Sequence, residues 1–198
     1  PPPEPVWQLD LTANRVDGSR FPAGTWARLT RQVLSEGDAF FSPTPNQGLP
    51  ALRQAIAQDL RDFRGMSVSP EQIVVGAGAE YLYLLLAQLL GSSAPFAVED
   101  PGYPKIRKVY TRCGVDCSPS HHYPTGIITP IARRQALLRW AETTGGIIIE
   151  DDYDSEFRFT GRPLPTLQSI DPRERVIYLP TFSQTIPPAL RLGCMVLP

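Results

Sequence analysis

Short apolar segments alternate with amphipathic segments along most of this chain, and this alternation restricts the fold more than any other feature of the sequence. Apolar runs of three or four residues predict strands at 72–75, 96–98, 147–149, 176–179 and 194–197. The segments around them predict helices over 25–35, 49–63, 80–90, 106–112 and 131–143. Strands that alternate with helices predict an α/β fold of three layers around a mostly parallel sheet.

The ends of the predicted strands carry the residues best suited to bind a ligand, because ligands of such sheets lie beyond the carboxyl ends of the strands. The first strand runs into Gly76-Ala77-Gly78-Ala79. Small residues there leave backbone N–H groups open to an anion at the start of the next helix. The same four residues would also make an ordinary tight turn, so alone they indicate little.

Two later strand ends are richer in charged and hydroxyl groups. Glu150-Asp151-Asp152 follows the apolar run at 147–149, and a carboxylate there could hold a protonated ring nitrogen. A solvated acidic loop or a metal site would explain the acids equally well. Thr181 and Ser183 precede Arg191, and this set suits a phosphate because guanidinium binds phosphate oxygens in a fork. A polar loop with a surface arginine would have the same composition.

Charge and cysteine content exclude some classes of function. The net charge of −1 gives no electrostatic footprint for duplex DNA, so we expect no specific DNA binding by this chain itself. An odd count of three cysteines, no signal peptide and no apolar run long enough for a bilayer predict a cytoplasmic protein without a membrane segment. Cys113, Cys117, His121 and His122 do not follow a known metal-ligand spacing, so no metal site is expected.

Five segments, in order along the chain, resemble the fold-type-I pyridoxal-phosphate family, and more narrowly the effector domains of MocR-type transcriptional regulators. The resemblance covers nearly the whole chain, and the long acidic motif at 150–159 favours the regulators over free-standing aminotransferases. It implies the large domain of a fold-type-I transferase, over 21–198, after a linker at 1–20. The five segments are QGLPALR at 47–53, VEDPGYP at 98–104, SPSHHYPTG at 118–126, EDDYDSEFRF at 150–159 and TFSQTIPPALRLG at 181–193.

The resemblance also implies a role for each matched residue around pyridoxal 5'-phosphate. Asp151 would pair with the ring nitrogen, Tyr153 would hydrogen-bond the ring hydroxyl, and Tyr103 would stack on the ring. His122 stands where the family has glutamine, near the ring hydroxyl, and its role is open. Phe41, where the family usually has tyrosine, would approach the cofactor of the second subunit in a homodimer. The phosphate would be held by Ala77, Gly78, Ala79, Thr181, Ser183 and Arg191.

Three departures from the family pattern bear on function. Gln184 occupies the position of the Schiff-base lysine, and a carboxamide is neither nucleophilic nor basic. The family has a helix and a strand between a segment like 114–117 and the SHQ motif, whereas here Cys117 runs directly into Ser118. We therefore expect a break or a strained shortcut at that junction. A helix-turn-helix domain before Pro1 and a small domain after Pro198 are absent from this sequence.

Three functions remain open from the sequence. The first is an effector-sensing domain that binds the cofactor non-covalently together with a small amine or amino acid, with DNA bound through the absent helix-turn-helix domain. The second is a fragment or inactivated form of a class I/II aminotransferase. The third is a degenerate relative without cofactor. Gln184 makes catalysis uncertain in all three, because the lysine amine supplies both the covalent link and the proton shuttle.

Overall fold

The computed structural model describes residues 8, 18–19, 21–35, 41–91, 96–97, 99, 114–117, 125–153, 165–183 and 185–198. The helix predicted at 106–112 and the junction between Cys117 and Ser118 lie outside these residues. The chain forms two compact units, Pro1–Pro43 and Thr44–Pro198. The first contains helix α1 (Ala23–Ser35), and the ring of Trp26 in this helix lies 5.9 Å from the ring of Phe21, which precedes it.

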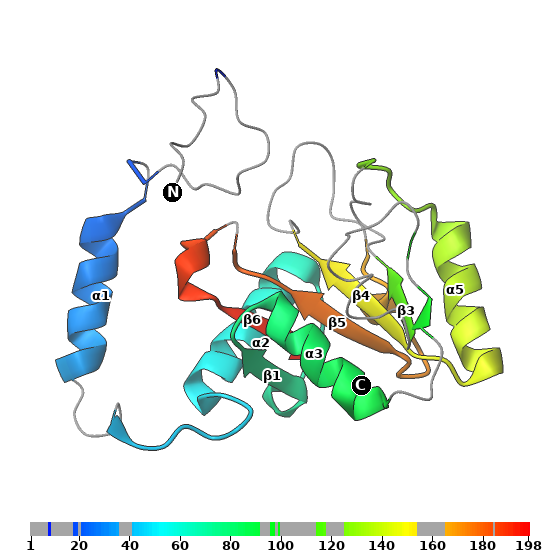
Figure 1. Cartoon of the computed structure of the whole chain (residues 1–198), viewed down its shortest axis with the longest axis horizontal. Coiled ribbons are helices and arrows are strands. Elements are labelled where there is room, and N and C mark those ends of the chain that lie inside the picture. Colours follow the sequence, from blue (N-terminus) through cyan, green and yellow to red (C-terminus); the bar gives the residue numbers. More distant parts are fainter. Residues whose placement is uncertain are drawn as a thin grey trace, which may run out of the picture. The chain divides into compact units, whose positions relative to one another are not determined.

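A six-stranded sheet forms the centre of the second unit, with strand order β1-β6-β5-β4-β3-β2 (Figure 1). Strands β2, β3, β4 and β5 pair in parallel, whereas β6 runs antiparallel to both of its neighbours, β1 and β5. The predicted mostly parallel α/β sheet is confirmed, with β6 reversed. The strands are β1 (Ile73–Gly76), β2 (Phe96–Ala97), β3 (Gly114–Cys117), β4 (Ile148–Asp152), β5 (Val176–Pro180) and β6 (Gly193–Val196).

Helices cover both faces of this sheet and complete the three predicted layers. On one face α3 (Ala79–Leu90) packs on side chains such as Ile149, Leu179 and Met195. On the other face α2 (Pro50–Arg64) packs on β1, β5 and β6, and α5 (Ile131–Thr144) packs on Ile148 and Val176. The alternation of side chains along β4, β5 and β6 separates the two cores, as the pleat of a strand requires.

Glycine ends the predicted helix α2 as the sequence indicates. Gly65 adopts the left-handed conformation (φ 66°) and its N–H donates to the carbonyls of the last turn.

Three short 3-10 turns, which were not predicted from the sequence, precede β1, β5 and β6; they span Pro70–Gln72, Gln168–Ile170 and Pro188–Leu190. Among the described helices, none has the length and apolarity needed to cross a bilayer.

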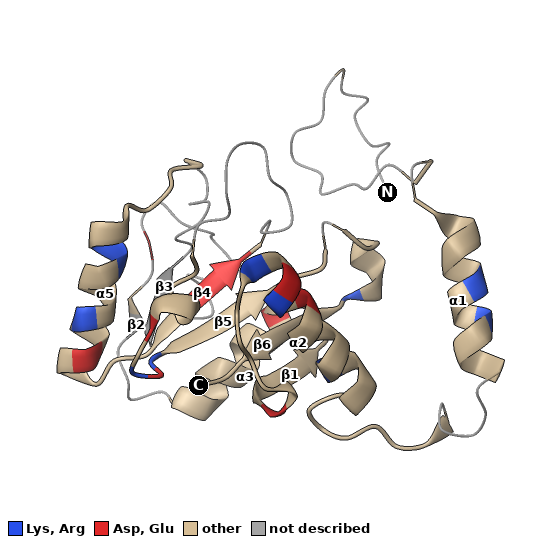
Figure 2. Cartoon of the chain, turned by 180° about the vertical axis from the view of Figure 1, so that it is seen from behind, with Lys and Arg blue, Asp and Glu red and all other residues tan. Residues whose placement is uncertain are grey.

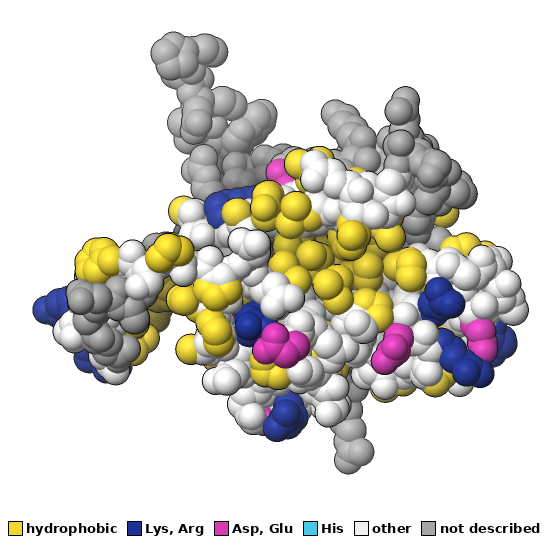
Figure 3. Space-filling model, turned by 90° about the horizontal axis from the view of Figure 1, so that it is seen from below, with side chains coloured by type: hydrophobic (Ala, Val, Ile, Leu, Met, Phe, Trp, Pro, Cys, Tyr) yellow, Lys and Arg dark blue, Asp and Glu magenta, His cyan; other side chains and the backbone are white. Residues whose placement is uncertain are grey.

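Apolar side chains are also exposed on the outer side of α3. Tyr81, Leu84 and Leu89 leave 46%, 49% and 69% of their surface accessible. Figure 3 shows one face of the molecule, on which apolar side chains gather into a continuous area. Contiguous apolar surface of this kind often marks an interaction site.

Candidate functional site

The site lies at the end of the sheet where strands β1, β4 and β5 end and strand β6 begins. Gly76 at the end of β1 pairs in register with Gly193 at the start of β6, and Thr181, just after β5, bridges Gly193 from the other side. Asp151 lies next to this edge, in register with Leu179 of β5. Three strand ends that are distant in sequence therefore meet at one place.

Gly78 forms the turn from β1 into α3 in a conformation that only glycine adopts readily. Its φ is 83° and its ψ is 170°, and its N–H donates to the Gly76 carbonyl oxygen over 2.8 Å. Helix α3 then begins at Ala79, so its first backbone N–H groups have no acceptor within the helix. An anion placed here would meet these donors and the positive end of the helix dipole.

Arg191 and Gly193 both approach the Gly78 backbone closely. A β-carbon added at Gly78 would lie 3.0 Å from the Nη2 atom of Arg191 and 3.1 Å from its Cζ atom. A β-carbon added at Gly193 would lie 3.2 Å from the Gly78 α-carbon. Arg191 itself has a left-handed backbone (φ 50°), which is uncommon outside glycine and follows the 3-10 turn at 188–190. The turn and the two glycines together place a guanidinium at the start of α3.

Thr181 adds a buried hydroxyl beside this cradle. Its side chain is 4% exposed, and its Oγ1 atom has no hydrogen-bond partner within the part of the chain that the structure describes. A buried hydroxyl without a partner is costly, so this atom is suited to a ligand. Of the other predicted phosphate residues, Ser183 and Ala79 are half-buried and Ala77 is exposed.

Asp151 is held by a tyrosine that the sequence analysis did not identify. The Tyr83 hydroxyl, from the second turn of α3, donates to the Asp151 Oδ2 atom over 2.5 Å. Tyr83 is only 2% exposed, and Asp151 is half-buried. In the sequence Tyr83 looks like one more apolar residue of a buried helix, and nothing in its spacing marks its hydroxyl as functional.

The three consecutive acids are part of strand β4, rather than a loop after it, so they alternate between the two faces of the sheet. Asp151 shares its face with Ile149 and α3, whereas Glu150 and Asp152 lie on the other face with Ile148. Figure 2 shows this acidic end of β4 in red. The solvated-loop alternative for these acids is wrong, because Glu150 is 0% and Asp152 is 2% exposed.

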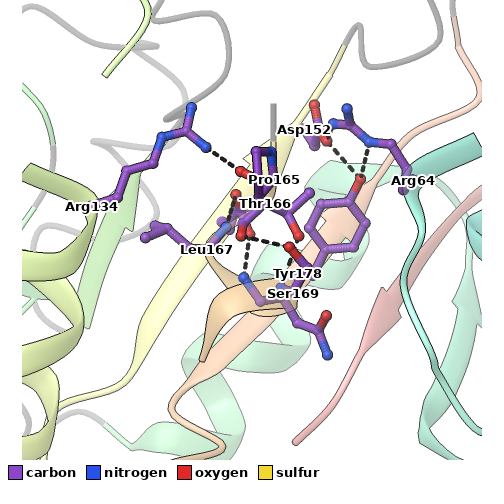
Figure 4. Close-up of polar contacts among 10 residues, drawn as sticks. Arg64, Arg134, Asp152, Pro165, Thr166, Leu167, Ser169 and Tyr178 are labelled. Carbon is purple, nitrogen blue, oxygen red and sulfur yellow. Dashed lines mark hydrogen bonds and ion pairs between the residues drawn. The ribbon is translucent and has the colours of Figure 1, made fainter. Parts of the chain in front are cut away.

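Glu150 and Asp152 each bind a different segment on that second face, and Figure 4 labels Asp152 beside Arg64 and Tyr178. Glu150 accepts hydrogen bonds from the backbone N–H groups of Leu167 (2.8 Å) and Gln168 (3.0 Å). Asp152 accepts from the Tyr178 hydroxyl over 2.6 Å and forms an ion pair with Arg64 at the end of α2. Burial raises the pKa of Glu150 to about 7, although the two backbone donors and the nearby arginines act against it.

The remaining predicted site residues either lie outside the described residues or are exposed. Tyr103, His122 and Gln184 lie outside the described residues. Tyr153 follows β4 directly and is 39% exposed. Phe41 belongs to the first unit and is 77% exposed. No group of three His, Cys, Asp or Glu side chains suited to a metal occurs among the residues described.

The chain matches the family model "Aminotransferase class I and II" over residues 6–125. It is 36% identical to an uncharacterized HTH-type transcriptional regulator, YdeL of Bacillus subtilis, over 96% of this chain and 47% of the relative. It is 35% identical to the HTH-type pyridoxine biosynthesis transcriptional regulator PdxR of Corynebacterium glutamicum, over 100% of this chain and 47% of the relative. The chain therefore spans about half the length of these curated relatives.

The solved structures show the same fold. An archaeal alanine:glyoxylate aminotransferase superposes with a TM-score of 0.84 at 23% identity, over 94% of this chain and 55% of that one. The alignment with PdxR runs over 222 residues although the whole chain has 198, so PdxR contains positions that have no counterpart here.

Proposed function

This chain belongs to the aminotransferase class I and II family, and on that premise we propose that it is the pyridoxal-phosphate-binding, effector-sensing domain of a MocR-type transcriptional regulator. Two curated relatives with more than a third of their aligned residues identical are HTH-type regulators, and this chain covers about half of each. The other half would include the helix-turn-helix domain that contacts DNA. The cytoplasmic location predicted from the sequence is the one such a regulator requires.

The observation that carries the proposal is the contact between Arg191 and Gly78 at the start of α3. The missing β-carbon at Gly78 leaves room for the guanidinium, which lies beside backbone N–H groups of the first helical turn. The unpartnered Thr181 hydroxyl is buried next to them, within the described residues. A guanidinium, helix N–H groups and a hydroxyl are the donors that a phosphate ester needs.

The second half of the cofactor site is the Asp151 carboxylate on the same face of the sheet as α3. A carboxylate at this position would hold the proton on the pyridine nitrogen of pyridoxal phosphate. When bound, the cofactor supplies an electron-poor ring that stabilises negative charge on an attached amino compound. Tyr153 would donate to the ring hydroxyl, Tyr103 would stack on the ring, and His122 would lie near the hydroxyl.

Gln184 makes this domain a binder rather than a catalyst in our proposal. The family position carries a lysine whose amine attaches the cofactor covalently and moves protons at the substrate. A glutamine carboxamide donates and accepts hydrogen bonds but does neither of these things. Reversible cofactor binding, with a small amine or amino acid as effector, is the activity that remains.

We propose that the domain works as a homodimer. The family resemblance implies that the sites lie at a dimer interface, with Phe41 of one subunit near the cofactor of the other. The exposed apolar residues Tyr81, Leu84 and Leu89 of α3 are compatible with a surface that is covered in an assembly.

A titration with pyridoxal phosphate tests the proposal directly. We expect saturable binding at one site per chain, followed by absorbance and fluorescence, and a spectral change when amines or amino acids are added to the complex. Dialysis should remove the cofactor, because no covalent bond holds it. The absence of saturable binding would contradict the proposal and favour a degenerate relative, whereas turnover of an amino acid would favour an aminotransferase.

The regulatory half of the proposal needs the complete reading frame. It should encode a helix-turn-helix domain before Pro1, and the complete protein should shift the mobility of DNA from its own promoter region in an effector-dependent way. The chain of residues 1–198 alone should not shift the same DNA at physiological salt. Sequence-dependent binding by the chain alone would contradict the assignment of its role.

A further inference from the structure

The hydrogen bond between Tyr83 and Asp151 joins the helix that begins at the phosphate cradle to the carboxylate at the other end of the site. The Tyr83 hydroxyl donates to the Asp151 Oδ2 atom over 2.5 Å. Hydrogen bonds to ionised acceptors are shorter and about twice as strong as bonds between neutral groups. A bond of this kind restrains the rotation of the carboxylate.

The surroundings of the phenol strengthen its effect on Asp151. Tyr83 is 2% exposed and packs in the cluster that includes Leu86, Ile149 and Leu179. Water is excluded from this side of the carboxylate, so a lost donor would not be replaced by solvent at low cost. Because the phenol is neutral, it brings no positive charge that would compete with a ring nitrogen for Asp151.

The position of Tyr83 along α3 also couples the two parts of the site. Tyr83 lies four residues after Ala79, one helical turn or about 6 Å along the axis. The first turn of the helix presents N–H groups beside Arg191, and the next turn presents the phenol to Asp151. One rigid element thus sets the spacing between the groups for the phosphate and the group for the ring nitrogen.

We infer that Tyr83 is a positioning residue for the cofactor ring, acting through Asp151 and without touching the cofactor itself. By holding Oδ2, the phenol sets the direction in which the second carboxylate oxygen faces the pyridine nitrogen. This inference rests on the proposed function, because it assumes that pyridoxal phosphate is the ligand. It goes further in naming the residue that orients the carboxylate for the ring.

The chain contains a matched control for the loss of this hydroxyl. Tyr178 is fully buried and donates to Asp152 over 2.6 Å, so it makes the same kind of bond to the adjacent carboxylate on the opposite face of the sheet. Tyr178→Phe deletes the same atom as Tyr83→Phe and removes a bond of nearly the same length, together with the 3.4 Å bond that Arg64 donates to the Tyr178 hydroxyl. Of the two variants, only Tyr83→Phe changes a contact of the carboxylate on the face of α3, which is Asp151.

The experiment compares the two variants with the wild-type chain in pyridoxal phosphate binding. We expect Tyr83→Phe to raise the dissociation constant about tenfold, the size of effect expected when one hydrogen bond that orients a charged group is lost. With pyridoxal phosphate labelled with ¹⁵N in the ring, the ¹⁵N chemical shift of the bound cofactor should also change. Tyr178→Phe should leave both the dissociation constant and the shift at their wild-type values.

A double-mutant cycle separates positioning from a general effect on the fold. In an Asp151→Ala background, Tyr83→Phe should weaken binding no further, because the carboxylate through which it acts is gone. An equal loss in both backgrounds, or an equal loss for the two phenol variants, would overturn the inference. If the wild-type chain binds no cofactor, the proposed function fails as well; if it binds and Tyr83→Phe changes nothing, the inference fails alone.

A second variant keeps the test decisive if Tyr83→Phe does not fold. Fluorotyrosine incorporated at position 83 keeps the ring and the hydroxyl but makes the phenol a stronger donor. The ¹⁵N shift of the bound cofactor should then differ from its value in the wild-type chain. An unmoved shift would show that the phenol does not act on the ring nitrogen through Asp151.

Discussion

The guanidinium group of Arg191 lies directly against Gly78, so close that a β-carbon on residue 78 would sit 3.0 Å from the Arg191 Nη2 atom. Two segments more than a hundred residues apart in sequence are thereby fixed to each other at the start of α3. The contact depends on the absence of a side chain at Gly78 and on its positive φ of 83°.

The first prediction concerns Gly78→Ala. The backbone conformation at Gly78 should cost alanine about 1–3 kcal/mol of stability, and the new methyl group should displace Arg191 from the phosphate cradle. Pyridoxal phosphate binding should therefore weaken, as measured by titration. Gly91→Ala is the matched control, because Gly91 has nearly the same backbone angles (φ 80°, ψ 161°) and open space around it. It should lose similar stability and keep cofactor binding; equal losses of binding in both variants would contradict this account.

The second prediction concerns the pH dependence of stability through Glu150. The folded protein holds the Glu150 proton up to about pH 7, because burial raises its pKa from the ordinary 4.5. Between these values the folded state binds more protons than the unfolded chain. The free energy of unfolding should therefore fall as pH rises through this window, by at most about 1.4 kcal/mol per pH unit.

Urea unfolding at a series of pH values measures this slope. Glu150→Gln removes the titrating carboxyl and should flatten the dependence of the unfolding free energy on pH. The substitution also puts an NH2 group in place of one of the two oxygens that accept from the backbone N–H groups of Leu167 and Gln168. Glu174→Gln changes an exposed glutamate and should leave the slope as it is in the wild type. A slope that Glu150→Gln leaves intact would assign the pH dependence to another group.

The third prediction separates the adjacent carboxylates Asp151 and Asp152. Asp152→Asn removes the charge that balances the largely buried Arg64, and breaking such a pair typically costs about 3–5 kcal/mol. Asp151→Asn should cost less stability but weaken pyridoxal phosphate binding strongly, because it removes the charge offered to the ring nitrogen. Unfolding curves and cofactor titrations of both variants check the contrast. A large loss of cofactor affinity in folded Asp152→Asn would contradict the separation of the two faces.

The fourth prediction concerns Gln184. Borohydride reduction of the wild-type chain loaded with pyridoxal phosphate should leave no pyridoxyl label at position 184, because a carboxamide forms no covalent link with the aldehyde. Gln184→Lys should gain the label there, as peptide mass mapping would show. Gln168→Lys, on the opposite side of the sheet from α3, should gain none. Label on Lys105 or Lys108 of the wild-type chain, with turnover of an amino acid, would overturn this account of the site.

The sequence predicts strands at 72–75 and 147–149 and a helix at 80–90, and the structure has these elements at 73–76, 148–152 and 79–90. It could not predict the direction of β6, because an apolar run such as 194–197 is compatible with either orientation. The separation of Glu150 and Asp152 from Asp151 follows from the two-residue period of a strand. It would have been predicted if the acids had been assigned to β4 rather than to a loop after it.

The role of Tyr83 could not be predicted from the sequence, because it depends on a tertiary contact. Its partner Asp151 lies 68 residues away, and the bond depends on how α3 lies over β4. The sequence shows only that the helix is apolar, and a tyrosine in such a helix is compatible with plain packing. Thr181 and Arg191 were predicted from the family motif, but their proximity to Gly78 depends on the close approach of Gly193 to the same turn.

The reversed strand β6 has a consequence for the way this domain is made in the cell. Among the described strands, β1 pairs with β6 alone, through contacts such as Ile73 with Val196, so this pairing cannot form until residues near 196 have left the ribosome. Until then the nascent chain carries β1 and β5 as open edges, which are prone to pair with other chains. Translation must run through β6 before the two halves of the cofactor cradle, Gly78 and Arg191, can meet. The cofactor cradle therefore cannot be complete before β6 has been translated.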